Sequence, residues 1–224
     1  MRSEREPLTT DLFESVPDVR PAQEMMAEGA VLLRGFAKPM ESVLIAALND
    51  VVAQAPFRHM VTPGGHQMSV AMTNCGSLGW VTDRTGYRYD ANDPEAATPW
   101  PAMPPSFREL AGQAATSAGF GGFSPDACLI NRYQPGARMS LHQDKDEDDF
   151  GAPIVSVSLG LPAIFLFGGL KRSDKPRRFR LEHGAVVVWG GPARLTFHGV
   201  APLADGEHAL IGRQRINLTF RKVR

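Results

Sequence analysis

The fold is decided by eight short apolar segments in the second half of the chain, which read ACLINRYQ (127–134), RMSLHQD (138–144), IVSVSLG (154–160), AIFLFGG (163–169), RRFRLEHG (177–184), AVVVWGG (185–191), RLTFHGV (194–200) and RINLTFRK (215–222). Gly, Pro, Asp or Ser separates most of them. Many short strands with regular turn residues between them predict a β-sandwich or barrel. We therefore expect a jelly-roll-like β domain from residue 126 onward.

The first half of the chain has a mixed pattern. Helical spacing of apolar residues predicts helices at ESVLIAALNDVVAQA (41–55) and PPSFRELAGQAATSA (104–118), and a short amphipathic helix at QEMMAEGA (23–30). VLLRGF (31–36) predicts a strand. The block 55–100 is rich in Gly, Thr, Tyr and Trp and predicts hairpins and loops that suit a cover over a site. The predicted class is α+β, dominated by β structure, with flanking helices.

Length and composition favour one globular domain. The chain has 224 residues, 43% of them hydrophobic, and no apolar run approaches the roughly 20 residues that span a bilayer. Residues 1–20 are charged with mixed sign, so we interpret them as a poorly ordered extension rather than a signal peptide. Residues 21–224 then form the domain. Cys75 and Cys128 are too few for a disulfide framework and predict buried thiols in a reducing cytoplasm.

Charge is balanced overall but segregated along the chain. The 24 basic and 24 acidic side chains cancel, which counts against a protein that coats nucleic acid non-specifically. Residues 171–180 and 213–224 are nevertheless basic, whereas 144–149 is acidic. The acidic run does not fit a calcium loop, because an EF-hand needs Gly at its sixth and Glu at its twelfth position, where Asp149 and Val155 stand. Local binding of a short nucleic-acid segment remains open.

A metal site is suggested by His142-Gln143-Asp144. Side chains two apart on a strand share a face, so His142 and Asp144 can supply two ligands to one metal. Among the six histidines, His198, near the end of a predicted strand, is the best third ligand. Two imidazoles and one carboxylate form the facial arrangement of non-haem Fe(II) oxygenases. An isolated HxD tripeptide is a weak signal.

The segment RINLTFR (215–221) carries a second candidate site. Alternation places Arg215, Asn217, Thr219 and Arg221 on one face of a strand and the apolar residues on the other. Burying two guanidiniums requires an anionic partner, and a small dicarboxylate would satisfy them. The alternative is an exposed basic edge strand. By the same parity Asn131 and Tyr133 share a face and either add hydrogen bonds to that ligand or lie on an edge-strand surface.

These residues, taken with their neighbours, resemble the AlkB family of Fe(II)- and 2-oxoglutarate-dependent dioxygenases, which remove alkyl groups from damaged bases. The resemblance runs from about residue 25 to 222 and rests on the stretches PFRHMVTPGG, MSVAMTNCGSLGW, DACLINRYQPGA, LHQDKDE, APIVSVSLGLPAIF, FGGLKR, VVVWGG and RINLTFR. It implies a double-stranded β-helix with a hairpin and loop nucleotide-recognition lid at 55–100. The cofactors that it implies are Fe(II), 2-oxoglutarate and O2.

The resemblance also implies roles for individual residues. His142, Asp144 and His198 match the catalytic iron ligands, and Arg215 matches the arginine that pairs with the far carboxylate of 2-oxoglutarate. Asn131, Tyr133, Asn217 and Arg221 match further cosubstrate contacts. Trp80 matches an aromatic residue that stacks on one face of the flipped base, and the ring of His142 would lie on the other face of that base. The remaining substrate-site matches are Thr62, Met72, Tyr87, Arg138, Gln143, Lys145, Asp146 and Arg172.

The chain departs from the family pattern at three positions. His66 replaces a lid tyrosine, which puts that nucleic-acid contact in doubt, whereas Arg138 replaces a lysine and keeps its charge. Ile216 replaces a tyrosine on the apolar side of the last strand. None of the three is an iron ligand.

The implied function is oxidative dealkylation of 1-methyladenine and 3-methylcytosine. The partner would be alkylated DNA, preferably single-stranded, with RNA as a further candidate, and we expect a cytoplasmic monomer without a membrane or an obligate protein partner. One alternative is a 2-oxoglutarate oxygenase that acts on a protein or small molecule. Another is a binding module that keeps the fold without catalysis.

Overall fold

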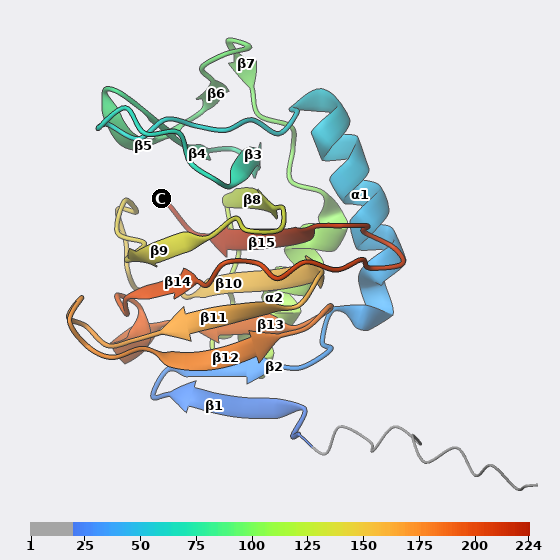
Figure 1. Ribbon diagram of the computed structural model, residues 1–224, viewed down its shortest axis with the longest axis vertical. Coiled ribbons are helices and arrows are strands. Elements are labelled where there is room, and N and C mark those ends of the chain that lie inside the picture. The colour runs from blue at the N-terminus through green and yellow to red at the C-terminus, as the bar shows by residue number, and fades with distance from the viewer. Residues whose placement is uncertain (1–19) are drawn as a thin grey trace, which may run out of the picture.

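The computed structural model describes residues 20–224, and two antiparallel sheets dominate it (Figure 1). The large sheet has the strand order β1-β2-β13-β10-β15-β8-β3 and the small sheet has the order β12-β11-β14-β9. The large-sheet strands are β1 (Gln23–Ala27), β2 (Ala30–Leu33), β3 (Ala71–Gly76), β8 (Ala127–Tyr133), β10 (Ile154–Gly160), β13 (Val186–Trp189) and β15 (Arg215–Arg221). The small-sheet strands are β9 (Met139–His142), β11 (Ala163–Phe167), β12 (Arg177–Leu181) and β14 (His198–Val200).

Within residues 20–224, α1 (Glu41–Gln54) and α2 (Pro105–Ser117) cover one face of the large sheet. Two short 3-10 turns are also present, η1 (Lys38–Met40) and η2 (Gly191–Ala193). Leu44 of α1 and Phe107 of α2 pack in one buried cluster with outward-facing strand residues such as Val157 and Leu218. Neither α1 nor α2 is both long and apolar enough to span a bilayer.

A second buried cluster fills the space between the two sheets. Phe165 and Phe167 of β11 approach Trp189 of β13, with ring centres 6.1 and 6.4 Å from that of Trp189. Sheets packed face to face around such a core form the predicted jelly roll, the double-stranded β-helix. The α+β, β-dominated class is therefore confirmed.

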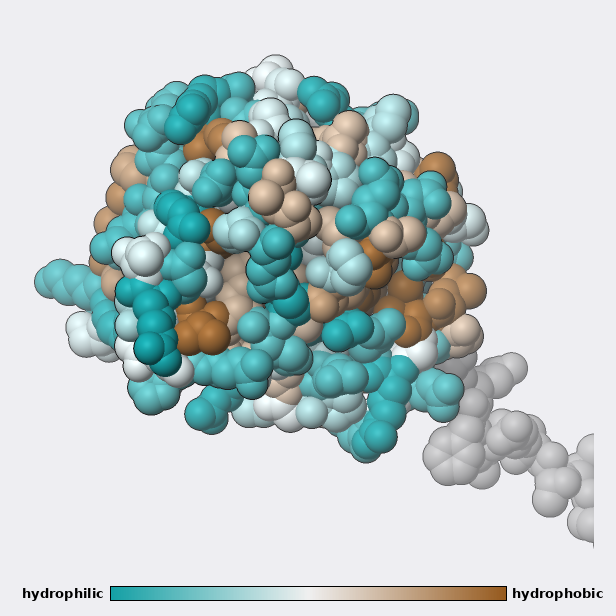
Figure 2. Space-filling view, turned by 90° about the horizontal axis from the view of Figure 1, so that it is seen from above, coloured by the Kyte–Doolittle hydropathy of each residue, from teal (hydrophilic) through white to brown (hydrophobic). Residues whose placement is uncertain are grey.

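Two small hairpins lie beyond β3, at the top of Figure 1. They are β4 (Gly79–Asp83) with β5 (Gly86–Asp90), and β6 (Asn92–Asp93) with β7 (Thr98–Pro99). The prediction of hairpins and loops for 55–100 is thus correct. On the face seen in Figure 2 the surface is largely hydrophilic, with small, separate hydrophobic areas.

The local predictions for 23–36 are partly wrong. Residues 23–27 form strand β1 rather than a helix, because pairing with β2 at the margin of the large sheet overrides the weak helical spacing. Gly29 makes the turn between the strands at φ +75°, and a Cβ there would stand 2.5 Å from the carbonyl oxygen of Gly190. The strand predicted at 31–36 is found only in its first half, as β2, and residues 34–36 form a turn. The prediction for 1–20 falls almost wholly outside the described residues.

Two details of the predicted site strands also need correction. β9 ends at His142, so Asp144 lies two residues beyond the strand, and His198 begins β14 instead of ending a strand. In addition, β15 is an interior strand whose residues are all buried, which rules out the exposed basic edge. The same order places β8 between β15 and β3, so Asn131 and Tyr133 are not on an edge strand.

Both cysteines are buried free thiols, as predicted. Cys75 of β3 and Cys128 of β8 are register partners across the sheet, a proximity that the sequence did not indicate.

Candidate metal centre and active site

His142, Asp144 and His198 converge at one point. Their ligand atoms all lie within 4.8 Å of one another, and no other such group of His, Cys, Asp or Glu occurs in residues 20–224. The convergence follows from strand pairing, because His142 of β9 is the register partner of His198 of β14. The chain then leaves β9 and brings the Asp144 carboxylate to within 3.6 Å of His142 Nε2 and 3.8 Å of His198 Nε2.

Backbone contacts orient both imidazoles. His142 Nδ1 lies 2.8 Å from the carbonyl oxygen of Ser140, and His198 Nδ1 lies 3.0 Å from that of Thr196. A carbonyl only accepts, so each Nδ1 carries the proton and each Nε2 keeps its lone pair for a metal. This tautomer and orientation are typical of metal-binding histidines.

The charges around the triad favour the ligand forms of these groups. Burial opposes ionisation of Asp144, but Arg221 and the two imidazoles outweigh it and hold the pKa of this carboxyl well below its usual range. Arg221 donates two hydrogen bonds to Asp144 Oδ2, at 2.6 and 3.1 Å. Burial, with a further contribution from His142, lowers the pKa of His198 to about 4. At neutral pH the site therefore offers one carboxylate and a neutral buried imidazole.

Arg215 is a buried cation that has no carboxylate partner within residues 20–224. The residue is 1% exposed, and its NH2 group donates to the Ser158 hydroxyl at 2.9 Å. Nε and NH1 have no hydrogen-bond partner in the described part of the chain, and neither has Asn131 Oδ1. Buried donors without partners cost free energy unless a ligand satisfies them. Such an orphaned guanidinium fits the far carboxylate of 2-oxoglutarate.

Of the other predicted cosubstrate residues, Tyr133, Asn131 and Asn217 lie on β8 and β15 towards Arg215, whereas Arg221 stands at the far end of β15 beside Asp144. Tyr133 is the register partner of Arg215 on β8, and Asn131 is the register partner of Asn217, to which its amide donates at 3.4 Å. All of them line one cavity of about 950 Å³ that also contains the metal triad. The two predicted ligand sites are therefore parts of a single site.

Every predicted substrate-contacting residue lines the same cavity, namely Thr62, Met72, Trp80, Tyr87, Arg138, Gln143, Lys145, Asp146 and Arg172. Arg138, Lys145 and Arg172 are exposed at the rim. The Trp80 ring stacks on Tyr87 at 5.7 Å, and its Nε1–H donates to Asp146 Oδ2 at 2.8 Å. Met72 is 1% exposed and also belongs to the core between the sheets, so packing alone would account for it. His66 lines the cavity as well.

Three residues near the triad were missed in the sequence. Glu147, Arg194 and Tyr89 form a buried charge and hydrogen-bond network behind Asp144. Glu147 follows Asp144 by three residues within the acidic run 144–149, which carries no local sign of a buried carboxylate. The partners come from distant segments, so no local pattern could have revealed the network.

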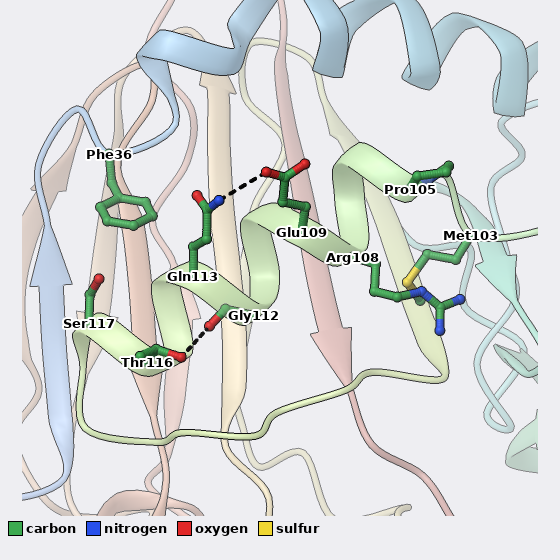
Figure 3. Close-up of a pocket in the computed structure, with 9 residues that line it drawn as sticks. All are labelled: Phe36, Met103, Pro105, Arg108, Glu109, Gly112, Gln113, Thr116 and Ser117. Atoms are coloured by element: carbon green, nitrogen blue, oxygen red, sulfur yellow. Dashed lines mark hydrogen bonds between the residues drawn. The ribbon is translucent and has the colours of Figure 1, made fainter.

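A second hollow, of about 880 Å³, lies along the outer surface of α2 (Figure 3). Its lining includes Phe36, Met103 and the polar side chains of Glu109 and Gln113, which bond to each other. No residue predicted for a site is among its lining. Within α2, Gln113 donates to Glu109 and Thr116 donates to the Gly112 carbonyl, and no metal-ligand cluster of residues 20–224 lies in this hollow.

Comparisons with known proteins agree with this geometry. The model of the 2OG-Fe(II) oxygenase superfamily matches residues 29–221. The alpha-ketoglutarate-dependent dioxygenase AlkB of Escherichia coli (strain K12) is 62% identical over 212 residues, covering 95% of this chain and 97% of that protein. The tRNA demethylase abh1 of Schizosaccharomyces pombe is 34% identical over 66% of this chain and 53% of its own.

A solved structure supports the same assignment. The structure of OsALKBH1 superposes with a TM-score of 0.79 at 29% identity, covering 89% of this chain and 99% of that one. The likeness thus extends from the sequence to the fold. The chain belongs to the 2OG-Fe(II) oxygenase superfamily and, within it, to the AlkB family of Fe(II)- and 2-oxoglutarate-dependent dioxygenases.

Proposed function

We propose that this enzyme removes alkyl groups oxidatively from damaged nucleobases, with 1-methyladenine and 3-methylcytosine as its main substrates. The observation that carries the proposal is the shared cavity. The metal triad, an unpaired buried arginine and an aromatic pair on a hairpin all open onto the same 950 Å³ space. A flipped base placed against that hairpin would lie over the triad.

In this proposal the protein holds the reagents in place. His142, Asp144 and His198 would bind Fe(II), and Arg215 would hold the far carboxylate of 2-oxoglutarate with help from Tyr133 and Asn131. With O2, the bound iron and keto acid would supply the oxidising power that hydroxylates an alkyl carbon: one oxygen atom goes to that carbon and the other to succinate, as the keto acid loses CO2. Buried Asn217 and Thr219 also line this cavity. The hydroxymethyl group on the base nitrogen then leaves as formaldehyde.

The base itself would be held by stacking. Trp80 would contact one face, and the half-buried ring of His142 the other. Stacking of this kind is worth about 1–3 kcal/mol per base. Asp146 lies next to Trp80 and places a carboxylate where a cationic methylated base would gain from it. Arg138, Lys145 and Arg172 at the rim supply charges for backbone phosphates, and Thr62, Tyr87 and Gln143 complete the cavity wall.

The finer features of the proposal concern the nucleic acid and the organisation of the enzyme. Single strands are favoured, because an unpaired base need not be extruded from a duplex, which costs a few kcal/mol. RNA is included, since a relative is named a tRNA demethylase. Residues 21–224 would act as one domain, with 55–100 as the recognition lid. The two buried free thiols support a reducing compartment, the cytoplasm, and a monomer suffices because one chain supplies the whole cavity.

The deciding experiment is mass spectrometry of a 3-methylcytosine oligonucleotide incubated with the enzyme, Fe(II), 2-oxoglutarate and air. The oligonucleotide should lose about 14 mass units, the mass of one CH2 group, and formaldehyde and succinate should appear. Omitting the enzyme, Fe(II), 2-oxoglutarate or air should prevent all three changes. A methylated peptide serves as the competing substrate. Formaldehyde from the peptide and none from the oligonucleotide would replace this proposal with a protein-modifying activity.

A further inference from the structure

Glu147 is a buried carboxylate that does not belong to the metal triad. Its side chain is 1% exposed, and both oxygens are engaged. Oε2 accepts from Arg194 at 2.9 Å, while Oε1 accepts from the Tyr89 hydroxyl at 2.7 Å and pairs with Arg221 Nε at 3.3 Å. An ion buried this deeply needs such partners, because removing it from water is costly.

Both arginines that Glu147 contacts also hold Asp144. Arg221 binds the Asp144 side chain through Oδ2, and Arg194 donates to the Asp144 backbone carbonyl at 2.8 Å. Two guanidiniums thus share two carboxylates, so the network is neutral as a whole. Displacing the Glu147 carboxylate would remove a partner of both arginines. The Asp144 carboxylate, which these arginines hold, would then lose part of its fixed orientation.

The third partner of Glu147 comes from the hairpin over the cavity. Tyr89 lies on β5 directly opposite Trp80 of β4, and alternation places both side chains on the same hairpin face. Burial raises the pKa of Tyr89, so its hydroxyl keeps the proton that it donates to Glu147. One phenol therefore connects the hairpin to the group that orients a metal ligand.

We propose that Glu147 is a positioning residue that couples the β4–β5 hairpin to the metal ligand Asp144. Metal binding then orders the hairpin, and by reciprocity a docked hairpin strengthens metal binding. Tyr89 is the contact on the hairpin side and Arg221 the contact on the metal side. The inference rests on the metal centre of the proposed function and is independent of which substrate the cavity takes.

The test compares the wild-type chain with Tyr89→Phe, which removes a single oxygen atom from the hairpin side. Co(II) is titrated without oxygen, and its visible absorption reports affinity and ligand geometry. Hydrogen exchange of residues 79–90 is followed by mass spectrometry with and without Co(II) and 2-oxoglutarate. In the wild type, metal should slow this exchange about tenfold, the effect of one hydrogen bond to a charged group. In Tyr89→Phe the metal-dependent slowing should fall below about twofold.

Arg88→Gln is the matched control. Arg88 is the neighbour of Tyr89 on β5 but lies on the opposite hairpin face, where it pairs with Asp83 at 2.9 Å. This variant should loosen the hairpin equally with and without metal and keep the metal-dependent slowing. Glu147→Gln should change the Co(II) spectrum and weaken Co(II) binding. Circular dichroism establishes that each variant is folded, and Tyr89→Phe alone decides the question if Glu147→Gln is not.

The outcomes separate the two proposals. If the wild type binds no Co(II), the metal centre and the proposed function fail. If it binds Co(II) and Tyr89→Phe retains the full metal-dependent slowing, the coupling is wrong and the proposed function stands.

Discussion

Arg215 and Tyr133 face each other across β15 and β8, with the guanidinium carbon 5.0 Å from the centre of the phenol ring. This cation–π contact packs the guanidinium against the face of the ring. Burial lowers the pKa of Arg215, with Tyr133 opposing that effect. A cation kept under these conditions, with two nitrogens unpaired, is organised for an incoming carboxylate.

Replacing Arg215 should therefore remove the anchor of the cosubstrate. Arg215→Ala should weaken 2-oxoglutarate binding by about 2–4 kcal/mol, roughly 30- to 1000-fold, while metal affinity changes little. Isothermal titration with 2-oxoglutarate in the presence of Mn(II) measures this loss. Arg213→Ala, which removes an exposed ion pair with Asp205, is the control and should bind normally. Unchanged affinity in Arg215→Ala would remove the anchor assignment.

Loss of a metal ligand should abolish metal binding and turnover together. His198→Ala deletes one of the two imidazoles. Replacing a residue that only hydrogen-bonds to a metal ligand lowers metal affinity about 10- to 100-fold, so the loss in His198→Ala should be larger. Equilibrium dialysis against Co(II) gives the affinity. His208→Ala, whose ring stacks on His183 outside the cavity lining, should bind metal as the wild type does. Demethylation that persists at the wild-type rate in His198→Ala would show that the triad is not the metal site.

Stacking on Trp80 should contribute to binding of the base rather than to the reaction of the cosubstrate. Trp80→Ala should raise KM for a methylated oligonucleotide roughly 5- to 150-fold, because the lost stacking free energy is about 1–3 kcal/mol. Turnover of 2-oxoglutarate without oligonucleotide should change less than about twofold. Trp80→Phe, which keeps an aromatic face, should restore most of the lost affinity. Equal losses in both assays, with no rescue by phenylalanine, would contradict a stacking role.

The metal-free enzyme should lose stability in a defined acidic window. The pKa of His198 is about 4 when folded, against 6.5 as its ordinary value, because burial disfavours the cation. Between pH 6.5 and 4 the unfolded chain takes up a proton that the folded chain refuses, so stability falls as pH falls. The contribution is complete above pH 6.5 and amounts to about 3 kcal/mol. Asp144, whose pKa is lowered, acts only below its ordinary value of 3.8.

Urea unfolding with a chelator at pH 7.5 and 4.5 measures this effect. His198→Gln, which cannot titrate there, should lose about 2–3 kcal/mol less than the wild type over the same interval. Parallel losses in the two proteins would mean that the His198 imidazole is not kept neutral by its surroundings.

The sequence predicted those parts of the molecule that depend on local periodicity. Strict alternation in RINLTFR places Arg215 and Asn217 on one face, as found, and helical spacing predicts α1 and α2 to within a residue or two. The helix predicted at 23–30 failed because sheet pairing, which is non-local, decided its conformation. Strand alternation correctly predicted that His142 and Asp144 lie close together, but β9 ends at His142 and Asp144 reaches the metal site from the following loop.

The network around Glu147 marks the limit of such reasoning. Tyr89, Arg194 and Arg221 are separated from Glu147 by 58, 47 and 74 positions, and only the folded chain brings them together. The same holds for the unpaired atoms of Arg215, because a missing partner is visible only when every neighbour is placed.

The candidate site is divided between the two sheets. His142 and His198 belong to the small sheet, whereas Arg215 and Tyr133 belong to the large one. The spacing between the layers, maintained by Phe165, Phe167 and Trp189, thus fixes how far a bound metal lies from an anchored carboxylate. A smaller residue at Phe165 or Phe167 would let the layers slide by a fraction of an ångström. Product formation would then decline at temperatures where each sheet is still intact, so the melting temperature would overestimate the range in which the enzyme works.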